Sequence, residues 1–481
     1  MSHDARAAGG LTPAILQRLA TIVGREHALT DADQQLPYLR EWRELYQGRA
    51  GVVVRPGTTE QVAAIMAIAN AHAIPVVPQG GNTGLVGGQI PFNGEILLSV
   101  GRLKRVRELD ASGYSMTVEA GLTLAEAQAA AASVERLFPL SLPSEASCQI
   151  GGTLASNAGG VGVLAYGNAR QLVLGLEVVL ADGRVLPGLS ALKKDNTGYD
   201  LKDLFVGSEG TLGIITAATL RLYPQPAEQA TAVVALPELG AALAVSAAAQ
   251  AAAGASLTAF EFLPRRGLDV VLRHVAGTRD PLPSPGPTPG AWYGLIELSG
   301  LAADGGARRV LEAILNSAQQ KGLIIDAALA NSLGQARAFW RLREAISEAQ
   351  KFEGGSIKND VSVPIAKIPA FIAHADALIL AVCPGARPLA FGHFGDGNVH
   401  YNILQPLGMP TPAFLALMAP LQDAVNAAVG AFGGSISAEH GIGVMKREAL
   451  ARVKSPVELD LMRAIKRAFD PKGILNPGKV L

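Results

Sequence analysis

The stretch that decides the fold is Pro78-Gln79-Gly80-Gly81-Asn82-Thr83-Gly84, a glycine-rich loop directly after a strand-like run at Ile74–Val77. Two similar segments follow it, Ile150-Gly151-Gly152-Thr153-Leu154-Ala155-Ser156-Asn157-Ala158-Gly159-Gly160 and Val206-Gly207-Ser208-Glu209-Gly210-Thr211-Leu212-Gly213. Glycines at this density let backbone N–H groups converge on an anion. A single segment could be a simple tight turn, but three in one half of the chain favour a cofactor with a pyrophosphate. None has the G-x-G-x-x-G pattern of a nicotinamide-binding Rossmann domain, which is therefore disfavoured.

Length and composition set the broad class. The chain has 481 residues, which favours two domains, and its 49% hydrophobic and 17% charged residues are typical of a globular protein. Lys+Arg and Asp+Glu are equal at 41 each, so no global charge points to nucleic acid. Two cysteines exclude a disulfide framework, and an N-terminus with Asp4 and no apolar run does not resemble a secretory signal. We expect a cytoplasmic protein without a transmembrane segment, with a peripheral position at the inner membrane as the alternative.

The order of strand-like and helical runs predicts an α+β fold. We expect a cofactor-binding domain over residues 1–222, a substrate domain with an antiparallel sheet over 223–435, and a C-terminal segment, 436–481, that returns to the first domain. A capping box at 58–61 predicts a helix towards His72, and another helix is expected from about Leu333 to Gln350. Five prolines within 281–289 indicate a surface loop. The other expected elements are strands at 52–54, 74–77, 96–99, 115–119, 173–180, 356–363 and 388–404, a hairpin turn at 181–184 and a helix near 456–469.

The second half carries a histidine pair in Gly392-His393-Phe394-Gly395-Asp396-Gly397-Asn398-Val399-His400-Tyr401-Asn402. Asp396-Gly397 is typical of a two-residue hairpin turn. That turn would make His393 and His400 direct cross-strand neighbours, with Cβ atoms about 5 Å apart. Asn402 would share their face because side chains alternate along a strand.

Two imidazoles at that separation can hold one metal ion. A catalytic metal site needs a third protein ligand, and Glu439 is the best candidate, which leaves the adjacent His440 for another role. The alternative is a hairpin with two hydrogen-bonded histidines and no metal.

A cationic substrate grip is the third candidate site. Arg343 and Ser347 lie four apart on the expected helix and would share a face, and Lys358 follows on a strand-like run. Such a trio would bind a carboxylate. From the pattern alone a solvated arginine is the simpler interpretation.

The three glycine-rich segments, with Pro143-Ser144 before the second and Lys194–Leu201 before the third, resemble the FAD-binding domain of the vanillyl-alcohol-oxidase (p-cresol-methylhydroxylase) type. The resemblance extends from about Val52 to Asn476-Pro477-Gly478-Lys479. The glycine-rich loop carries Asn82 where covalently flavinylated members often have a histidine, so the resemblance implies non-covalent FAD. The implied cofactor-binding residues are Pro78, Gly80, Gly81, Asn82, Thr83, Gly84, Pro143, Ser144, Gly151, Gly152, Ser156, Asn157, Gly159, Gly160, Gly210, Ile214 and Asn476.

The two histidine motifs resemble those of the D-2-hydroxyacid dehydrogenase branch, which includes D-2-hydroxyglutarate, D-lactate and glycolate enzymes. The resemblance implies that His393, His400 and Glu439 hold a divalent metal, with zinc expected, and that His440 is the catalytic base. It also implies that Arg343, Ser347 and Lys358 hold a distal carboxylate, with Asn402 orienting the substrate. Ser347 replaces a threonine of the family pattern. Lys358 favours D-2-hydroxyglutarate over D-lactate.

Three rival functions stay open at this point. They are a D-lactate or glycolate dehydrogenase of the same branch, a metal-dependent hydrolase, and a non-catalytic subunit that holds FAD. The chain has no iron–sulfur ligands, so electrons would leave to an external acceptor, a quinone or an electron-transfer flavoprotein. Relatives of this kind are often dimers, and a homodimer is expected.

Overall fold

A computed structural model describes residues 10–282 and 292–481, and the expected proline-rich loop at 281–289 lies almost entirely outside them. The chain forms two compact units. The first consists of residues up to Gly160 with Gly167–Gln225 and Glu439–Leu481, and the second of Val161–Tyr166 with Pro226–Ala438. Each unit is described separately below.

The first unit begins with a small sheet in the order β1-β2-β4-β3, whose last three strands are parallel. Its apolar strand residues are fully buried, as at Val53 and Leu97. Helix α3 begins where Thr58 accepts a hydrogen bond from the Gln61 N–H, as expected from the sequence. The reciprocal half of the expected capping box is absent, because Gln61 Oε1 accepts from Gly57 N–H instead. The elements are α1 (Pro13–Val23), β1 (Ala28–Leu29), α2 (Ala32–Leu39), β2 (Ala50–Val54), α3 (Thr59–Ala71), β3 (Val76–Gln79) and β4 (Glu95–Ser99).

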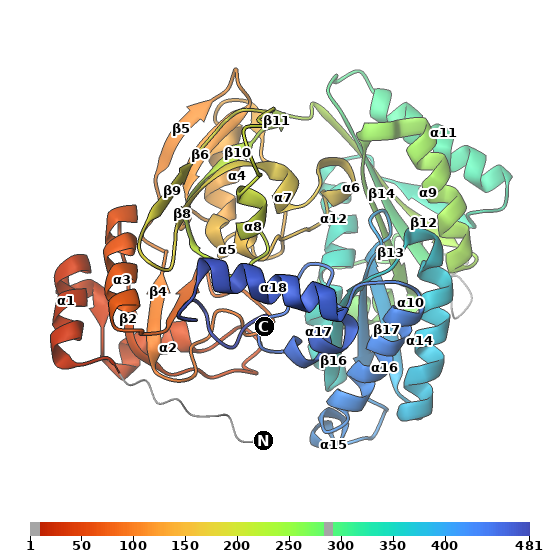
Figure 1. Ribbon diagram of the computed structural model, residues 1–481. Coiled ribbons are helices and arrows are strands. Elements are labelled where there is room, and N and C mark those ends of the chain that lie inside the picture. Colours follow the sequence, from red (N-terminus) through yellow and green to blue (C-terminus); the bar gives the residue numbers. More distant parts are fainter. Residues whose placement is uncertain (1–9, 283–291) are drawn as a thin grey trace. The chain divides into compact units, whose positions relative to one another are not determined.

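A second sheet of the first unit has five antiparallel strands in the order β5-β6-β10-β8-β9 (Figure 1). The hairpin expected at 181–184 joins β8 to β9, with Gly183 at φ 89° in the turn. The elements are β5 (Val106–Asp110), β6 (Ser115–Glu119), α4 (Leu124–Ala132), β7 (Arg136–Leu137), α5 (Ile150–Ala155), α7 (Ala169–Leu172), β8 (Val173–Val179), β9 (Val185–Gly188), α8 (Lys202–Phe205), β10 (Ile214–Arg221) and β11 (Tyr223–Pro224).

The C-terminal segment returns to the first unit and completes it. It contains α17 (Arg447–Val453) and α18 (Pro456–Phe469), and its last residues run alongside β3. The Val76 N–H donates to Ile474 O, and the Asn476 N–H donates to Val76 O, both at 2.8 Å. Lys466 of α18 donates to the carbonyls of Thr211 and Leu475, each at 2.8 Å. These bonds attach the segment to the glycine-rich region.

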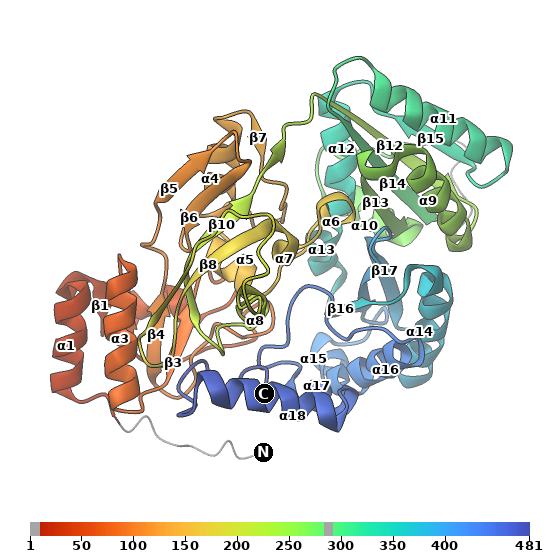
Figure 2. The same cartoon turned by 45° about the horizontal axis from the view of Figure 1, so that its top comes forward.

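The second unit is built on a seven-stranded antiparallel sheet in the order β15-β12-β14-β13-β17-β18-β16. Helices cover both of its faces (Figure 2). The elements are α6 (Val163–Tyr166), β12 (Glu228–Leu236), α9 (Leu239–Ala253), β13 (Leu257–Pro264), α10 (Arg265–His274), β14 (Trp292–Gly300), α11 (Gly306–Gln320), β15 (Asp326–Leu329), α12 (Leu333–Glu344), α13 (Ile346–Ala349), β16 (Ser356–Ser362), α14 (Ile368–Val382), β17 (Arg387–His393), β18 (Asn398–Leu404), α15 (Thr411–Leu415) and α16 (Met418–Ala431).

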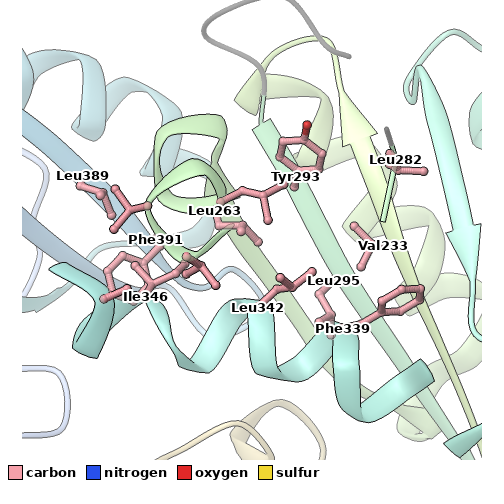
Figure 3. Close-up of a cluster of buried hydrophobic side chains, with 14 of the residues drawn as sticks. Val233, Leu263, Leu282, Tyr293, Leu295, Phe339, Leu342, Ile346, Leu389 and Phe391 are labelled. Atoms are coloured by element: carbon pink, nitrogen blue, oxygen red, sulfur yellow. The ribbon is translucent and has the colours of Figure 1, made fainter. Parts of the chain in front are cut away.

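Helix α12 packs its apolar face on this sheet and fixes the side chains next to it. Phe339 and Leu342 of α12, with Ile346 of α13, join Leu295 and Phe391 in one buried cluster (Figure 3). The single helix expected from about 333 to 350 is wrong in one respect. It is interrupted at Ala345, which lies between α12 and α13, so Arg343 and Ser347 belong to different helices.

Two stretches, Leu239–Ser256 and Ile365–Val382, are long and apolar enough to cross a membrane by length and composition alone. Each has one buried face within the second unit, as at Val245 of α9 and Phe371 of α14. The expectation of a protein without a transmembrane segment stays a prediction.

Candidate active site

The loop expected at Pro78–Gly84 begins at Gly80, because β3 extends through Gln79. Asn82 adopts a left-handed conformation at φ 56°, and its amide donates to the carbonyls of Pro37 and Arg40. Within the described chain, the backbone N–H groups of residues 80–84 donate no hydrogen bond. A row of unused N–H donors in a turn of this kind suits a pyrophosphate.

The structure brings the three glycine-rich segments together. A Cβ atom at Gly81 would lie 2.0 Å from Ser147 O, and one at Gly210 would lie 2.4 Å from the Pro78 ring. A Cβ atom at Gly80 would lie 3.5 Å from the Gly152 backbone, while a Cβ at Gly152 would meet nothing within 4 Å. The segments therefore pack through their glycines and leave open space beside Gly152.

Asn476 joins this region from the end of the chain. Its amide nitrogen donates to Gly88 O and Glu209 O, at 2.9 and 2.8 Å. Its buried side-chain oxygen has no hydrogen-bond partner in the described chain. The first unit thus has an unused buried acceptor as well as unused donors, which fits a bound group with both kinds of partner, as FAD has.

Glu439 and His440 lie on a turn that Glu209 holds in place. Glu209 Oε1 accepts from Ile442 N–H at 2.7 Å, and Oε2 accepts from Gly443 N–H at 2.8 Å. Burial raises the pKa of Glu209, although the two N–H donors oppose that effect. Glu439 itself accepts from the N–H of Gly160, at 3.1 Å. The predicted metal ligand and the predicted base are thereby attached to the glycine-rich segments of the first unit.

In the second unit, His393 and His400 lie on one face of the hairpin formed by β17 and β18, but the predicted register is wrong. His393 pairs with Asn398, and Phe391 pairs with His400, across a four-residue turn at 394–397. Asp396 Oδ1 accepts from the Asn398 N–H, which stabilises the longer turn. The register differs by two residues, so both histidines keep the same face as diagonal neighbours. Their ring centroids are 5.4 Å apart.

A buried carboxylate lies behind each of the two histidines. His393 Nδ1 is 2.7 Å from Glu261 Oε1, and His400 Nδ1 is 3.6 Å from Asp360 Oδ1. The separation between His400 and Asp360 is longer than a hydrogen bond. With Nδ1 hydrogen-bonded to Glu261, His393 would offer Nε2 to a metal, an arrangement typical of metal-binding histidines. The pair therefore fits a divalent metal, and zinc suits two imidazoles and a carboxylate.

Glu261 also binds the predicted substrate arginine. Arg343 Nε donates to Glu261 Oε2 at 2.8 Å, and the guanidinium lies over the Phe391 ring. Burial disfavours the ionised form of Glu261, but His393 and Arg343 outweigh it and lower the pKa of this carboxyl. Arg343 is 7% exposed, so it is not the solvated arginine of the simpler interpretation.

The other predicted substrate residues lie next to one another. Lys358 of β16 pairs with Asn402 of β18 and donates from Nζ to the backbone carbonyl of Ser347, at 3.0 Å. Asn402 donates to Gln350 Oε1 at 3.1 Å. Although Ser347 and Arg343 belong to different helices, the backbone carbonyl of Ser347 still contacts Lys358.

Three residues of this region were not predicted from the sequence, namely Glu209, Glu261 and Asp360. Their partners lie far along the chain, up to 234 residues away. One local signal existed for Glu261, because it is a single carboxylate within the apolar run Leu257–Pro264. A charge that must be buried in a strand indicates a charged partner.

The sequence is similar to known FAD-linked oxidases over most of its length. The family profile described as "FAD linked oxidases, C-terminal domain" matches residues 225–480, and the "FAD binding domain" profile matches residues 50–187. A D-2-hydroxyglutarate dehydrogenase of Stutzerimonas stutzeri is 36% identical over 97% of this chain and 99% of the relative. A mitochondrial D-2-hydroxyglutarate dehydrogenase of Arabidopsis thaliana is 37% identical over 96% and 80% of the two chains.

The solved structure of p-cresol methylhydroxylase with substrate bound superposes with a TM-score of 0.77 at 19% identity, over 98% of both chains. This likeness confirms the fold class expected from the sequence, an FAD-binding domain of this type with an antiparallel α+β domain.

Proposed function

The chain belongs to the FAD-linked oxidase family, and we propose that this FAD-dependent dehydrogenase oxidises D-2-hydroxyglutarate to 2-oxoglutarate. Relatives of that name align over nearly the whole chain. The observation that carries the proposal is that two of the predicted metal ligands and a predicted substrate residue lie on one face of the seven-stranded sheet. Two histidines backed by carboxylates share it with Lys358 and with Glu261, the partner of Arg343. D-2-hydroxyglutarate has an α-hydroxy acid at one end, which a metal can bind, and a second carboxylate at the other end, which cationic side chains can bind.

The first unit would hold FAD non-covalently, and the flavin would supply a hydride acceptor for oxidation at the substrate's α-carbon. The N–H groups of the Gly80–Gly84 loop would bind the pyrophosphate, and Asn476 would contact the cofactor through its side-chain oxygen. The other cofactor-binding residues are those assigned from the sequence.

His440 is proposed as the general base that takes the hydroxyl proton. Its ring lies beside Glu439, with Nε2 3.8 Å from Glu439 Oε1. Because Glu209 holds the following turn, the backbone that carries His440 is fixed before substrate binds.

His393, His400 and Glu439 are proposed as ligands of a divalent metal, zinc being the expected ion. Such a metal supplies Lewis-acid polarisation of the substrate hydroxyl and lowers its pKa. Glu439 belongs to the first unit and the histidines to the second, and the third ligand is assigned from the sequence resemblance.

Arg343, Lys358 and the Ser347 hydroxyl are proposed to bind the distal carboxylate, and Asn402 to orient the substrate. Arg343 uses Nε on Glu261, so its two terminal nitrogens are the ones that a carboxylate would engage in a bidentate pair. Lys358 adds a second positive charge, which a monocarboxylate such as D-lactate does not need.

Electrons would leave to an external acceptor, a quinone or an electron-transfer flavoprotein. The two cysteines of the chain are buried, free thiols, which are too few to hold an iron–sulfur cluster. We also propose a homodimer and a cytoplasmic location, with peripheral contact at the inner membrane as the alternative. Light scattering and cell fractionation test these two assignments.

Steady-state oxidation with an artificial electron acceptor tests the substrate. The purified flavoprotein is given D- and L-2-hydroxyglutarate, D-malate, D-lactate and glycolate, and 2-oxoglutarate is quantified. We expect the D-dicarboxylate to have the highest kcat/KM. A higher kcat/KM for D-lactate or glycolate would reassign the enzyme to monocarboxylates, and no turnover of any hydroxy acid would refute the function.

A further inference from the structure

We propose that Glu261 is a positioning residue that serves the metal ligand and the substrate arginine at once, a role that rests on the proposed function. Glu261 lies on β13, opposite His393 on β17, and is 1% exposed. Its two oxygens have separate partners. Oε1 is 2.7 Å from His393 Nδ1, and Oε2 accepts from Arg343 Nε at 2.8 Å.

The contact with His393 sets which ring nitrogen carries the proton. A carboxylate is an acceptor only, so Nδ1 must be protonated to face it. Nε2 of the neutral ring then keeps its lone pair, which is what a metal requires. The same side chain holds Arg343 by Nε, which fixes the plane of the guanidinium and the direction of its terminal nitrogens. One buried carboxylate thereby orders both ends of the substrate site.

This geometry predicts an asymmetric effect of Glu261→Gln. The amide has one acceptor oxygen and one donor nitrogen, but it faces two donors. Arg343 Nε can only donate, so the amide oxygen must stay with it. The amide nitrogen then faces His393 and favours the ring form with the proton on Nε2, which removes the lone pair that binds metal. The metal site should weaken, while Arg343 keeps its partner.

Glu297 on the neighbouring strand β14 provides a matched control. It is a glutamate on the same sheet face, and it is partly buried whereas Glu261 is fully buried. Both of its hydrogen bonds fall on one oxygen, Oε2, from Trp340 Nε1 at 2.7 Å and Thr231 Oγ1 at 2.9 Å. A glutamine can satisfy both with its single oxygen, and neither partner has a proposed role in binding.

The test measures zinc affinity of the FAD-loaded protein without substrate, by competition with a chelating dye. Zinc binding should weaken about 10- to 100-fold in Glu261→Gln and change less than about threefold in Glu297→Gln. At saturating zinc, Glu261→Gln should keep the wild-type ratio of KM for D-2-hydroxyglutarate to KM for D-lactate. Glu261→Ala should lose both zinc affinity and that ratio, because Arg343 is left unpaired.

Wild-type zinc affinity in Glu261→Gln would overturn the proposal, as would equal loss of zinc affinity in Glu297→Gln. A wild-type protein that binds no zinc would overturn it together with the metal part of the proposed function, so the two failures differ. If thermal unfolding shows that Glu261→Gln does not fold, Glu261→Asp is compared with Glu297→Asp. Aspartate is one methylene shorter, which withdraws its carboxylate from His393 as well as from Arg343. Zinc affinity should therefore fall in the first variant alone, and equal affinities would refute the role.

Discussion

Replacing Glu209 by alanine should slow flavin reduction while FAD stays bound. Its two oxygens accept backbone N–H groups of Ile442 and Gly443, and these residues follow His440 directly. No other acceptor in the described chain takes these two N–H groups. Removing the side chain therefore frees the turn that carries the proposed base.

The size of the effect follows from these two bonds. Hydrogen bonds to a charged group contribute about 1.5–3 kcal/mol each, so the pair contributes about 3–6 kcal/mol before the cost of burying the carboxylate is subtracted. That cost is visible in the raised pKa of Glu209. We take a net loss of about 2–3 kcal/mol, which corresponds to a rate constant about 30- to 150-fold lower.

The assay is anaerobic stopped-flow reduction of the flavin at saturating D-2-hydroxyglutarate, with FAD content read from the absorbance ratio. Glu126→Ala is the control, since Glu126 also accepts a backbone N–H, from Thr123, but in a helix cap of α4. It should lower the melting temperature slightly and leave the rate unchanged. A wild-type rate in Glu209→Ala would refute the claim that this carboxylate positions His440.

Three further predictions concern single residues. His440→Ala should retain FAD but reduce the flavin about 10²- to 10⁴-fold more slowly, and near-normal reduction would remove His440 from the role of base. Lys358→Met should raise KM for D-2-hydroxyglutarate about 10- to 100-fold and leave KM for D-lactate unchanged, whereas equal effects on both would contradict the distal-carboxylate assignment. Burial opposes ionisation of Glu353, but Arg387, His274 and Arg273 outweigh it and lower the pKa of this carboxyl from 4.5 to about 2. Its stabilising effect is therefore present above pH 4.5 and lost as pH falls towards 2, so thermal unfolding of Glu353→Gln should depend less on pH across that range than unfolding of the wild type.

The local patterns predicted the elements with the clearest sequence signals, because hydrophobic periodicity and caps act within a few residues. The helix at Pro456–Phe469 and the strand predicted from the β-branched run 52–54, observed as Ala50–Val54, are examples. The hairpin at His393 shows that local patterns do not determine which residues pair across two strands. Alternation determines which face a side chain takes, and a shift of two residues leaves every face unchanged. The pattern therefore placed both histidines on one face without determining their register.

The partners of the site could not be predicted in the same way. Glu261 meets a histidine 132 residues away, and Glu209 meets a turn more than 230 residues away. Such pairs depend on which strands become neighbours, and β13 and β17 are separated by several elements in the chain. The break at Ala345 was also not predicted, because nothing in the local sequence interrupts the helical pattern there.

The most direct test of the central claim is anaerobic bleaching of the flavin absorption by D-2-hydroxyglutarate, before and after treatment with a chelator. We predict fast bleaching by the native protein, little bleaching after the metal is removed, and recovery when zinc is added back. Equal bleaching with and without the chelator would contradict the metal-assisted mechanism. Absence of bleaching by D-2-hydroxyglutarate in the native protein would contradict the proposed substrate.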